Sequence, residues 1–302
     1  MKSEVGSSGA LPWVPQDEYT PEALAACEKA LRTIISRVGK WGPRLILFGG
    51  LAPRYLVKSP SAESKEHTGT TDLDVVIGVE IDVADVGVYT KLQEELGKAG
   101  FWPSDRGSFA WERKVDGVTV VLEFFCPVEA GGTPGSLKRN PGGEAGSKIS
   151  AIQLRGAQIA ALDSVTVVLS GEVLDHGGCR DVEVQVTNIL PFLVLKAFAL
   201  VTRDKEKDAY DLVWTLQAFG EAGPLSAAEA AVQSPIGDRE EVTEAMAVLE
   251  ERFAELDRQG PSNYARFFLG GRDDAEDERT RLRRDARGTV QTFLARWKEL
   301  RG

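Results

Sequence analysis

Two aspartates, Asp72 and Asp74, stand at alternate positions at the start of a strand predicted over Asp72–Val79. Residues i and i+2 of a strand point to the same face, so the two carboxylates converge. Paired anions repel each other unless a cation lies between them, and Mg²⁺ prefers oxygen ligands of this kind. The pattern predicts a metal site, and the alternative is a solvated strand end without a ligand.

A third carboxylate, Glu123, stands within the apolar run Val120–Phe125. A carboxylate inside an apolar strand must be paired, bound to a metal or shifted in pKa, because burying it alone is costly. With Asp72 and Asp74 on a neighbouring strand it would complete a cluster that can hold two metal ions. The alternative is an edge-strand position that faces water.

The pair Gly49-Gly50 follows a short apolar strand predicted over Arg44–Phe48 and precedes a helix predicted over Leu51–Val57. Glycines let the backbone turn sharply and approach a ligand, and the first N–H groups of a helix bind phosphate oxygens well. The pattern predicts a phosphate site, although two glycines after a strand also occur in tight turns that bind nothing.

Lys196 interrupts an otherwise apolar helix predicted over Leu190–Val201. Such a lysine either reaches the surface or meets an anion in a cleft. Asp208 and Asp211 are i, i+3 partners on the next predicted helix, within reach of Lys196 or of a nearby arginine. A functional late acid and a structural salt bridge are both open interpretations of this group.

Histidine and cysteine are too few and too scattered for several common kinds of active site. The two histidines (His67, His176) and three cysteines (Cys27, Cys126, Cys179) form no closely spaced zinc-ligand cluster. No Gly-x-Ser-x-Gly motif accompanies the histidines, which disfavours a serine hydrolase. Scattered thiols, no predicted signal peptide and charge-free stretches of at most 12 residues favour a cytoplasmic protein without a membrane span.

The order of predicted elements indicates an α/β (α+β) chain with a mixed sheet, followed by an all-α part. The apolar content of 42% and charged content of 27% are typical of globular proteins. We expect a flexible segment over 1–19, a catalytic domain over 20–187 and a helical domain over 188–302. Asp116-Gly117 predicts a hairpin turn, and 127–148 a long loop. Helices are expected over Pro21–Val38, Asp82–Gly100, Leu190–Val201, Lys205–Phe219, Ser226–Gln233, Asp238–Gln259 and Glu278–Leu300.

The charge of the chain is uneven. The net charge of −10 argues against a surface coated generally by nucleic acid. Residues 279–302, however, hold eight basic and two acidic side chains, a local charge of 8 − 2 = +6. Two interpretations of this segment are open and do not exclude each other: an RNA-binding surface, and an ordinary amphipathic helix with its apolar side chains packed inward.

Gly49-Gly50, Asp72-Leu73-Asp74 and Glu123, taken in order, resemble the nucleotidyltransferase fold of the DNA polymerase β superfamily. The helix of Lys196, followed by Lys207–Leu212, is more narrowly similar to the AbiEii/MenT-type nucleotidyltransferases. These are toxins of bacterial toxin–antitoxin and phage-defence systems. The resemblance covers roughly residues 45–216, with a longer spacing between the glycines and Asp72 than is usual in the family.

This resemblance implies an enzyme that transfers a nucleotide from an NTP to RNA, including the 3′ end of tRNA. Gly49 and Gly50 would hold the triphosphate, and Asp72 and Asp74 would hold Mg²⁺, with Glu123 as the third acid. Lys196 would contact the triphosphate, and Asp208 or Asp211 would be the late acid of the family. A cognate antitoxin is an expected partner. The rival functions are nucleotide transfer to a small molecule such as an antibiotic or to a protein hydroxyl, and nucleotide binding without catalysis.

Overall fold

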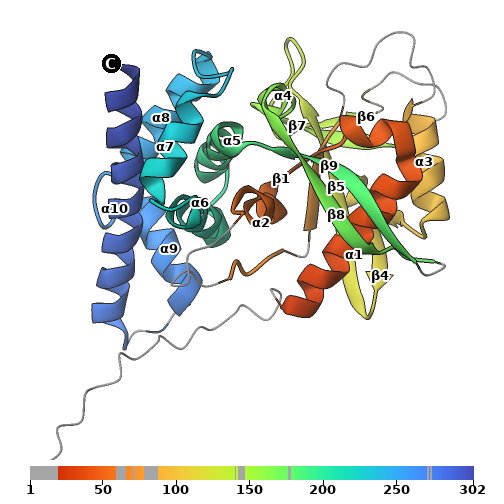
Figure 1. Cartoon of the computed structure of the whole chain (residues 1–302), viewed down its shortest axis with the longest axis horizontal. Helices are drawn as coiled ribbons and strands as arrows, with labels where there is room; N and C mark the ends of the chain where they lie inside the picture. The colour runs from red at the N-terminus through yellow and green to blue at the C-terminus, as the bar shows by residue number, and fades with distance from the viewer. Residues whose placement is uncertain are drawn as a thin grey trace, which may run out of the picture.

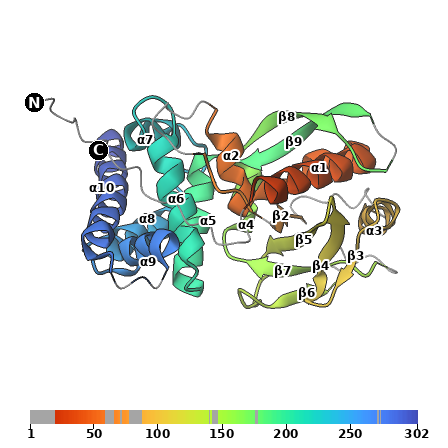
Figure 2. The same cartoon turned by 90° about the horizontal axis from the view of Figure 1, so that it is seen from below.

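The computed structural model describes residues 20–58, 66–70, 72–77, 88–139, 141, 147–175, 178–270, 272 and 274–302. Within them, a mixed sheet with helices on its face occupies one half of the molecule, and helices alone occupy the other (Figures 1 and 2). The predicted α+β class, with a mixed sheet followed by C-terminal helices, is therefore confirmed. The expected flexible segment over 1–19, residues 59–65 after the helix expected over Leu51–Val57, and the start of the helix expected from Asp82 lie outside the described residues.

The sheet has the strand order β3-β4-β5-β2-β1-β9-β8, and β7 joins it by pairing with both β5 and β6. The central strand β2 is antiparallel to β1 and parallel to β5. The strands are β1 (Ile46–Phe48), β2 (Asp72–Val76), β3 (Trp102–Ser104), β4 (Gly107–Val115), β5 (Val118–Pro127), β6 (Leu137–Arg139), β7 (Ser150–Leu154), β8 (Ser164–Glu172) and β9 (Cys179–Thr187).

Several local predictions are confirmed, and each has a local physical cause. Asp116 and Gly117 adopt positive φ angles of 49° and 89° between β4 and β5, as a two-residue hairpin turn requires. The first helix, α1, spans Pro21–Val38, and the hydroxyl of Thr20 accepts a hydrogen bond from the backbone N–H of Ala23 at 3.1 Å. Thr20 thereby caps one of the N–H groups that a helix start leaves unpaired.

The helices other than α1 are α2 (Ala52–Leu56), α3 (Val88–Lys98), α4 (Ala157–Leu162), α5 (Ile189–Thr202), α6 (Glu206–Ala218), α7 (Pro224–Val232), α8 (Glu240–Arg252), α9 (Gln259–Leu269) and α10 (Glu276–Arg301). In the described part of the chain, strands end at Thr187 and only helices follow. None of the described helices is both long and apolar enough to cross a membrane.

Two sequence-based predictions are wrong in detail. The helix expected over Asp238–Gln259 ends early, at Arg252 of α8, and a separate helix that was not expected, α9, begins at Gln259, with the buried side chain of Phe253 between the two. A β-carbon on Gly260 would lie 2.5 Å from the Phe253 ring, so the missing side chain lets α9 fold back over that ring. The loop expected over 127–148 contains the short strand β6, which gains its stability from pairing with β7.

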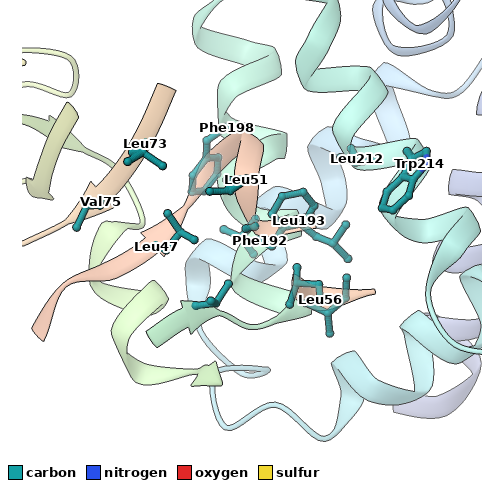
Figure 3. Close-up of a cluster of buried hydrophobic side chains, with 14 of the residues drawn as sticks. Leu47, Leu51, Leu56, Leu73, Val75, Phe192, Leu193, Phe198, Leu212 and Trp214 are labelled. Carbon is teal, nitrogen blue, oxygen red and sulfur yellow. The ribbon is translucent and has the colours of Figure 1, made fainter. Parts of the chain in front are cut away.

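One continuous set of buried apolar side chains joins the sheet to the helices that follow it. Leu47 of β1 and Leu73 of β2 belong to the same buried cluster as Phe192 and Leu193 of α5 (Figure 3). Leu51, directly after the glycine pair, is fully buried in this cluster. This packing therefore holds α5, and α6 after it, against the end of β1 where Gly49-Gly50 lies.

Candidate active site

The sheet register brings the predicted glycines and acids together. Phe48, the residue before Gly49, is paired with Asp74 across β1 and β2, and Asp74 is paired with Glu123 across β2 and β5. Leu73, between Asp72 and Asp74, is fully buried on the opposite face, whereas both aspartates remain partly exposed. Three adjacent strands thus carry the expected groups side by side.

The glycine turn is fitted closely to its surroundings. Gly49 has a φ of +70°, and a β-carbon there would lie 1.9 Å from Oδ2 of Asp74. A β-carbon on Gly50 would lie 3.0 Å from the hydroxyl oxygen of Thr70 and 3.1 Å from Nζ of Lys207. Only glycine fits at residue 49, because any side chain would displace the Asp74 carboxylate and strain the backbone.

The acids create a strongly negative site. Burial, followed by the negative charges of Glu123 and Asp72, raises the pKa of Asp74 to about 7. Burial and the charge of Asp72 also raise the pKa of Glu123. Oδ1 of Asp72 is buried without a hydrogen-bond partner. Such a group of anions favours a bound cation, because a cation offsets both their burial and their mutual repulsion.

Arg106, on the turn between β3 and β4, supplies part of this missing charge. Its Nη1 lies 3.2 Å from Oε1 of Glu123 and 3.6 Å from Oδ1 of Asp72, while half of its side chain stays exposed. Across the described ranges, no three His, Cys, Asp or Glu side chains are close enough together to hold a metal ion as they stand. No sequence pattern predicted a role for Arg106, which lies in a turn that the motif does not include.

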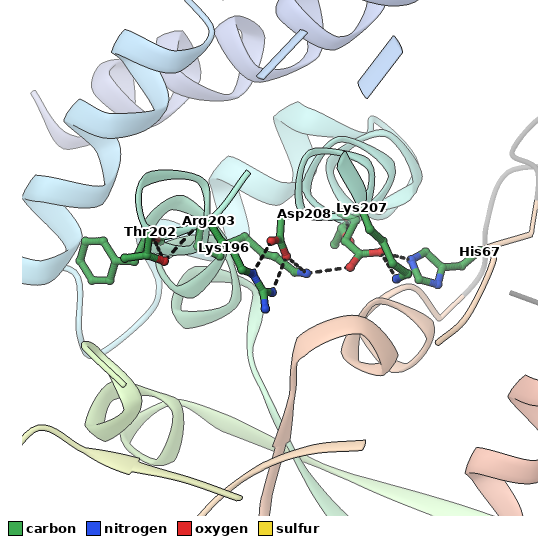
Figure 4. A network of polar contacts seen from close by, with 10 residues as sticks. His67, Lys196, Thr202, Arg203, Lys207 and Asp208 are labelled. Carbon is green, nitrogen blue, oxygen red and sulfur yellow. Dashed lines mark hydrogen bonds and ion pairs between the residues drawn. The ribbon is translucent and has the colours of Figure 1, made fainter. Parts of the chain in front are cut away.

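A second network of charges lies on α5 and α6 (Figure 4). Nζ of Lys196 lies 2.8 Å from Oδ1 of Asp208 and 2.7 Å from Oδ2 of Asp211, and all three side chains are buried. The structure therefore joins the three residues that the sequence had singled out here. It holds them in a salt bridge, which was one of the two open interpretations.

Further groups complete this network. Arg203 contacts both carboxylate oxygens of Asp208, with Nε at 2.7 Å and Nη2 at 2.9 Å. Nζ of Lys207 lies 2.7 Å from Oδ1 of Asp211. The positive charges lower the pKa values of both aspartates despite their burial, so the two acids stay ionised. Arg203 and Lys207 lie in the same charged stretch of sequence, in which only Asp208 and Asp211 were predicted as site residues.

His67 ties the segment 66–70 to α6. Its Nε2 lies 2.9 Å from Oδ1 of Asp211, and its Nδ1 accepts a hydrogen bond from the Gly69 N–H at 3.1 Å. The hydrogen on the ring is therefore assigned to Nε2, which donates it to Asp211. Burial lowers the pKa of His67 to about 4, so the ring is neutral at pH 7. The N–H of Thr68 donates to the hydroxyl of Tyr210 at 3.0 Å, which fixes the same segment a second time.

The positive charges of the α5–α6 region act on the acids of the sheet. The charges of Arg203 and Lys196 act to lower the pKa of Asp74, and the charge of Lys205 acts to lower that of Glu123. Cations of the α5–α6 region therefore lie within electrostatic range of the sheet acids. Such an arrangement, with carboxylates on one side and cations on the other, suits a ligand that combines a metal ion with phosphate groups.

Comparison with protein-family models, with curated proteins and with solved structures gave no match for this chain.

Proposed function

We propose that the chain is a Mg²⁺-dependent nucleotidyltransferase that moves a nucleoside monophosphate from an NTP to an RNA acceptor. The observation that carries this proposal is the strand register that places Gly49, directly after β1, beside Asp74 of β2 and Glu123 of β5, within electrostatic range of the cations of α5 and α6. The order of these groups along the chain is that of the DNA polymerase β superfamily, and the resemblance of the helical motif to AbiEii/MenT-type toxins supports a role as a toxin. A cognate antitoxin is proposed as a partner on the same basis.

The residues present fit a divalent cation. Asp72, Asp74 and Glu123 would hold it, because Oδ1 of Asp72 is buried without a hydrogen bond, and the pKa of Asp74 is raised by its burial and by the negative charges of Glu123 and Asp72. Arg106 must move aside, and about half of its side chain is exposed to solvent, into which it can turn. When bound, Mg²⁺ would lower the pKa of the acceptor hydroxyl and offset the negative charge of the leaving pyrophosphate.

The protein's own residues bind and orient the nucleotide. The turn at Gly49-Gly50 carries no side chain toward Asp74, so a phosphate can approach the backbone N–H groups there. Arg203, with half of its side chain exposed, is the cation best placed to meet the β- and γ-phosphates. Lys196 is buried together with both of its acid partners, Asp208 and Asp211. We therefore assign it an electrostatic contribution rather than the first contact with the phosphates.

The proposed reaction is an in-line displacement at the α-phosphate. The acceptor hydroxyl loses its proton to solvent, and its oxygen forms a bond with the α-phosphorus. The bond from that phosphorus to the oxygen bridging to the β-phosphate breaks, and pyrophosphate leaves. Aligned carboxylates and cations favour this step by holding the two oxygens and the phosphorus in line.

The acceptor is proposed to be RNA, with the tRNA 3′ end as the first candidate. To test this, the protein is supplied with each α-³²P-labelled NTP and Mg²⁺, together with total RNA, an aminoglycoside or a carrier protein. Label in RNA alone supports the proposal. Label only in the drug or the carrier protein would contradict the RNA acceptor while leaving nucleotide transfer intact.

A further inference from the structure

A polar pocket of about 480 Å³ is lined by residues of α9 and α10, the end of α8, the end of α5 and the segments next to these helices. Leu200, which is buried, and Val201, which is half exposed, are its two apolar lining residues. Three arginines from three different helices line it, Arg252 of α8, Arg266 of α9 and Arg283 of α10. A pocket into which three helices each contribute a guanidinium is a candidate anion site.

Two of these arginines have no counter-ion among the residues that the structure describes. Arg266 lies 3.4 Å from Oδ2 of Asp204 and 3.7 Å from an oxygen of Glu206, so its charge is offset. Neither Arg252 nor Arg283 forms an ion pair with any acid in the described part of the chain, and Nε of each is buried without a hydrogen-bond partner. A buried N–H group normally has a partner, and a guanidinium is suited to a phosphate.

The other polar groups of the pocket fit more than a bare anion. Oε1 of Gln259, on the first turn of α9, is also buried without a partner and can only accept a hydrogen bond. The carboxylates of Asp204 and Asp257 line the same pocket and would repel an isolated phosphate. The unpartnered donors of Arg252 and Arg283 beside the unpartnered acceptor of Gln259 match a nucleotide unit, whose phosphate accepts and whose ribose hydroxyl donates.

The pocket is joined to the active site by the three-residue connection between α5 and α6, which consists of Arg203, Asp204 and Lys205. Arg203 and Lys205 have extended backbone conformations, so side chains along this connection alternate in direction. The charges of Arg203 and Lys205 act on Asp74 and Glu123, whereas Asp204 points into the pocket. The same short connection therefore carries charges that act on the sheet acids and a side chain that lines the pocket.

We infer that this pocket binds a backbone nucleotide of the RNA acceptor, with Arg252 and Arg283 holding its phosphate. This inference rests on the proposed function and extends it, because it assigns a binding site to the acceptor at a distance from the reacting hydroxyl. It also distinguishes among the basic residues of the segment 279–302, because it gives only Arg283 a role in the pocket. Arg283 faces the pocket, whereas the next residue, Arg284, is exposed outside it, and Arg296 and Lys298 are paired with Glu229 and Glu250.

The test measures binding of a fluorescein-labelled tRNA acceptor-stem RNA by anisotropy over a range of salt concentrations. The variants are Arg252→Gln and Arg283→Gln, with Arg284→Gln as the control, matched to Arg283→Gln because it removes the same charge from the same helix. We expect each pocket variant to weaken binding about 10-fold or more and to reduce the salt slope by roughly one. The control should change affinity less than about 2-fold. Arg252→Lys and Arg283→Lys, which keep the charge, serve as second variants if either glutamine variant unfolds.

The outcomes separate this inference from the proposed function. Wild-type protein that labels RNA, with pocket variants that bind RNA as tightly as wild type, would overturn the inference and leave the function standing. Loss of AMP or pyrophosphate binding in the pocket variants, with RNA binding unchanged, would assign the pocket to a free nucleotide and also overturn it. In kinetics, we expect a higher KM for RNA with an unchanged KM for the NTP. Absence of both RNA labelling and RNA binding in wild-type protein would reject the function itself.

Discussion

Gly49 and Asp74 approach each other so closely that a β-carbon at residue 49 would stand 1.9 Å from the Oδ2 atom of the aspartate. The contact joins two features that the sequence places 25 positions apart, a glycine turn after one strand and an acid at the start of another. It means that the backbone of the turn and the carboxylate share one small space. A ligand that reaches Asp74 therefore also meets the backbone of the glycine turn.

Replacing Gly49 with alanine should damage both stability and nucleotide transfer. The positive φ alone costs an alanine about 1–2 kcal/mol, and the new methyl group must also displace the Asp74 carboxylate. Gly131→Ala is the matched control, because Gly131 has a φ of +78° and an added β-carbon would meet nothing within 4 Å. Urea unfolding should show the larger loss for Gly49→Ala. Equal losses for the two variants would show that the close contact carries no energy.

Substitutions of Lys196 and Arg203 should distinguish a residue that mainly stabilises the fold from one that contacts the substrate. Lys196→Met leaves two buried aspartates without one of their cations, and we expect a loss of about 3 kcal/mol in the free energy of unfolding. Arg203→Gln removes two hydrogen bonds to Asp208 but leaves Lys196 in place, so it should cost less stability than Lys196→Met while raising the KM for the NTP. Thermal unfolding and initial rates measure both effects. A Lys196→Met protein as stable as wild type but without activity would place Lys196 on the substrate instead.

The buried neutral His67 should make stability fall as the solution becomes acidic. Its pKa is about 4 in the folded protein against 6.5 for an ordinary histidine, so between these values the unfolded chain binds the extra proton. Stability is then lost as the pH falls from about 6.5 to 4, by about 3 kcal/mol in total. Asp74 and Glu123, whose pKa values are raised, act in the opposite direction over an overlapping range.

The difference between wild type and His67→Gln removes that opposing contribution, because both proteins keep the same acids. We expect the stability difference between them to shrink or reverse as the pH falls from 6.5 to 4. Urea unfolding at several pH values gives this difference directly. A difference that does not change with pH would contradict a neutral, buried His67.

Sequence patterns predicted the parts of the fold that local physics determines. Asp116-Gly117 requires positive φ angles, and Thr20 caps a helix, so each signal acts within a few residues. The pairing of Asp74 with Glu123 was also expected, because alternation along two apolar strands leaves the acids on one face. The short strand β6 was missed because its three residues gain stability only from β7, which lies beyond the predicted loop.

The candidate site was only partly predictable for the same reason. Arg106 reaches Glu123 from a turn 17 residues earlier, and His67 reaches Asp211 from 144 residues away. Nothing in their sequence neighbourhoods indicates these partners, which only the folded chain brings together. The double pairing of Lys196 was foreseen as one of two possibilities, because a lysine and two aspartates at these spacings suit either a ligand or a salt bridge.

The most direct test compares wild type with Asp74→Asn in transfer of α-³²P-labelled nucleotide to total RNA in the presence of Mg²⁺. The substitution conserves volume and removes a charge that the fold disfavours, so the variant should fold at least as stably as wild type. Asp181→Asn, which alters an exposed carboxylate on β9, is the control. We predict label in tRNA-sized RNA with wild type and the control, and a loss of more than about 100-fold with Asp74→Asn, since even the outer partners of metal ligands cost 10–100-fold. A folded Asp74→Asn protein that labels RNA at the wild-type rate would contradict the central role given to this carboxylate.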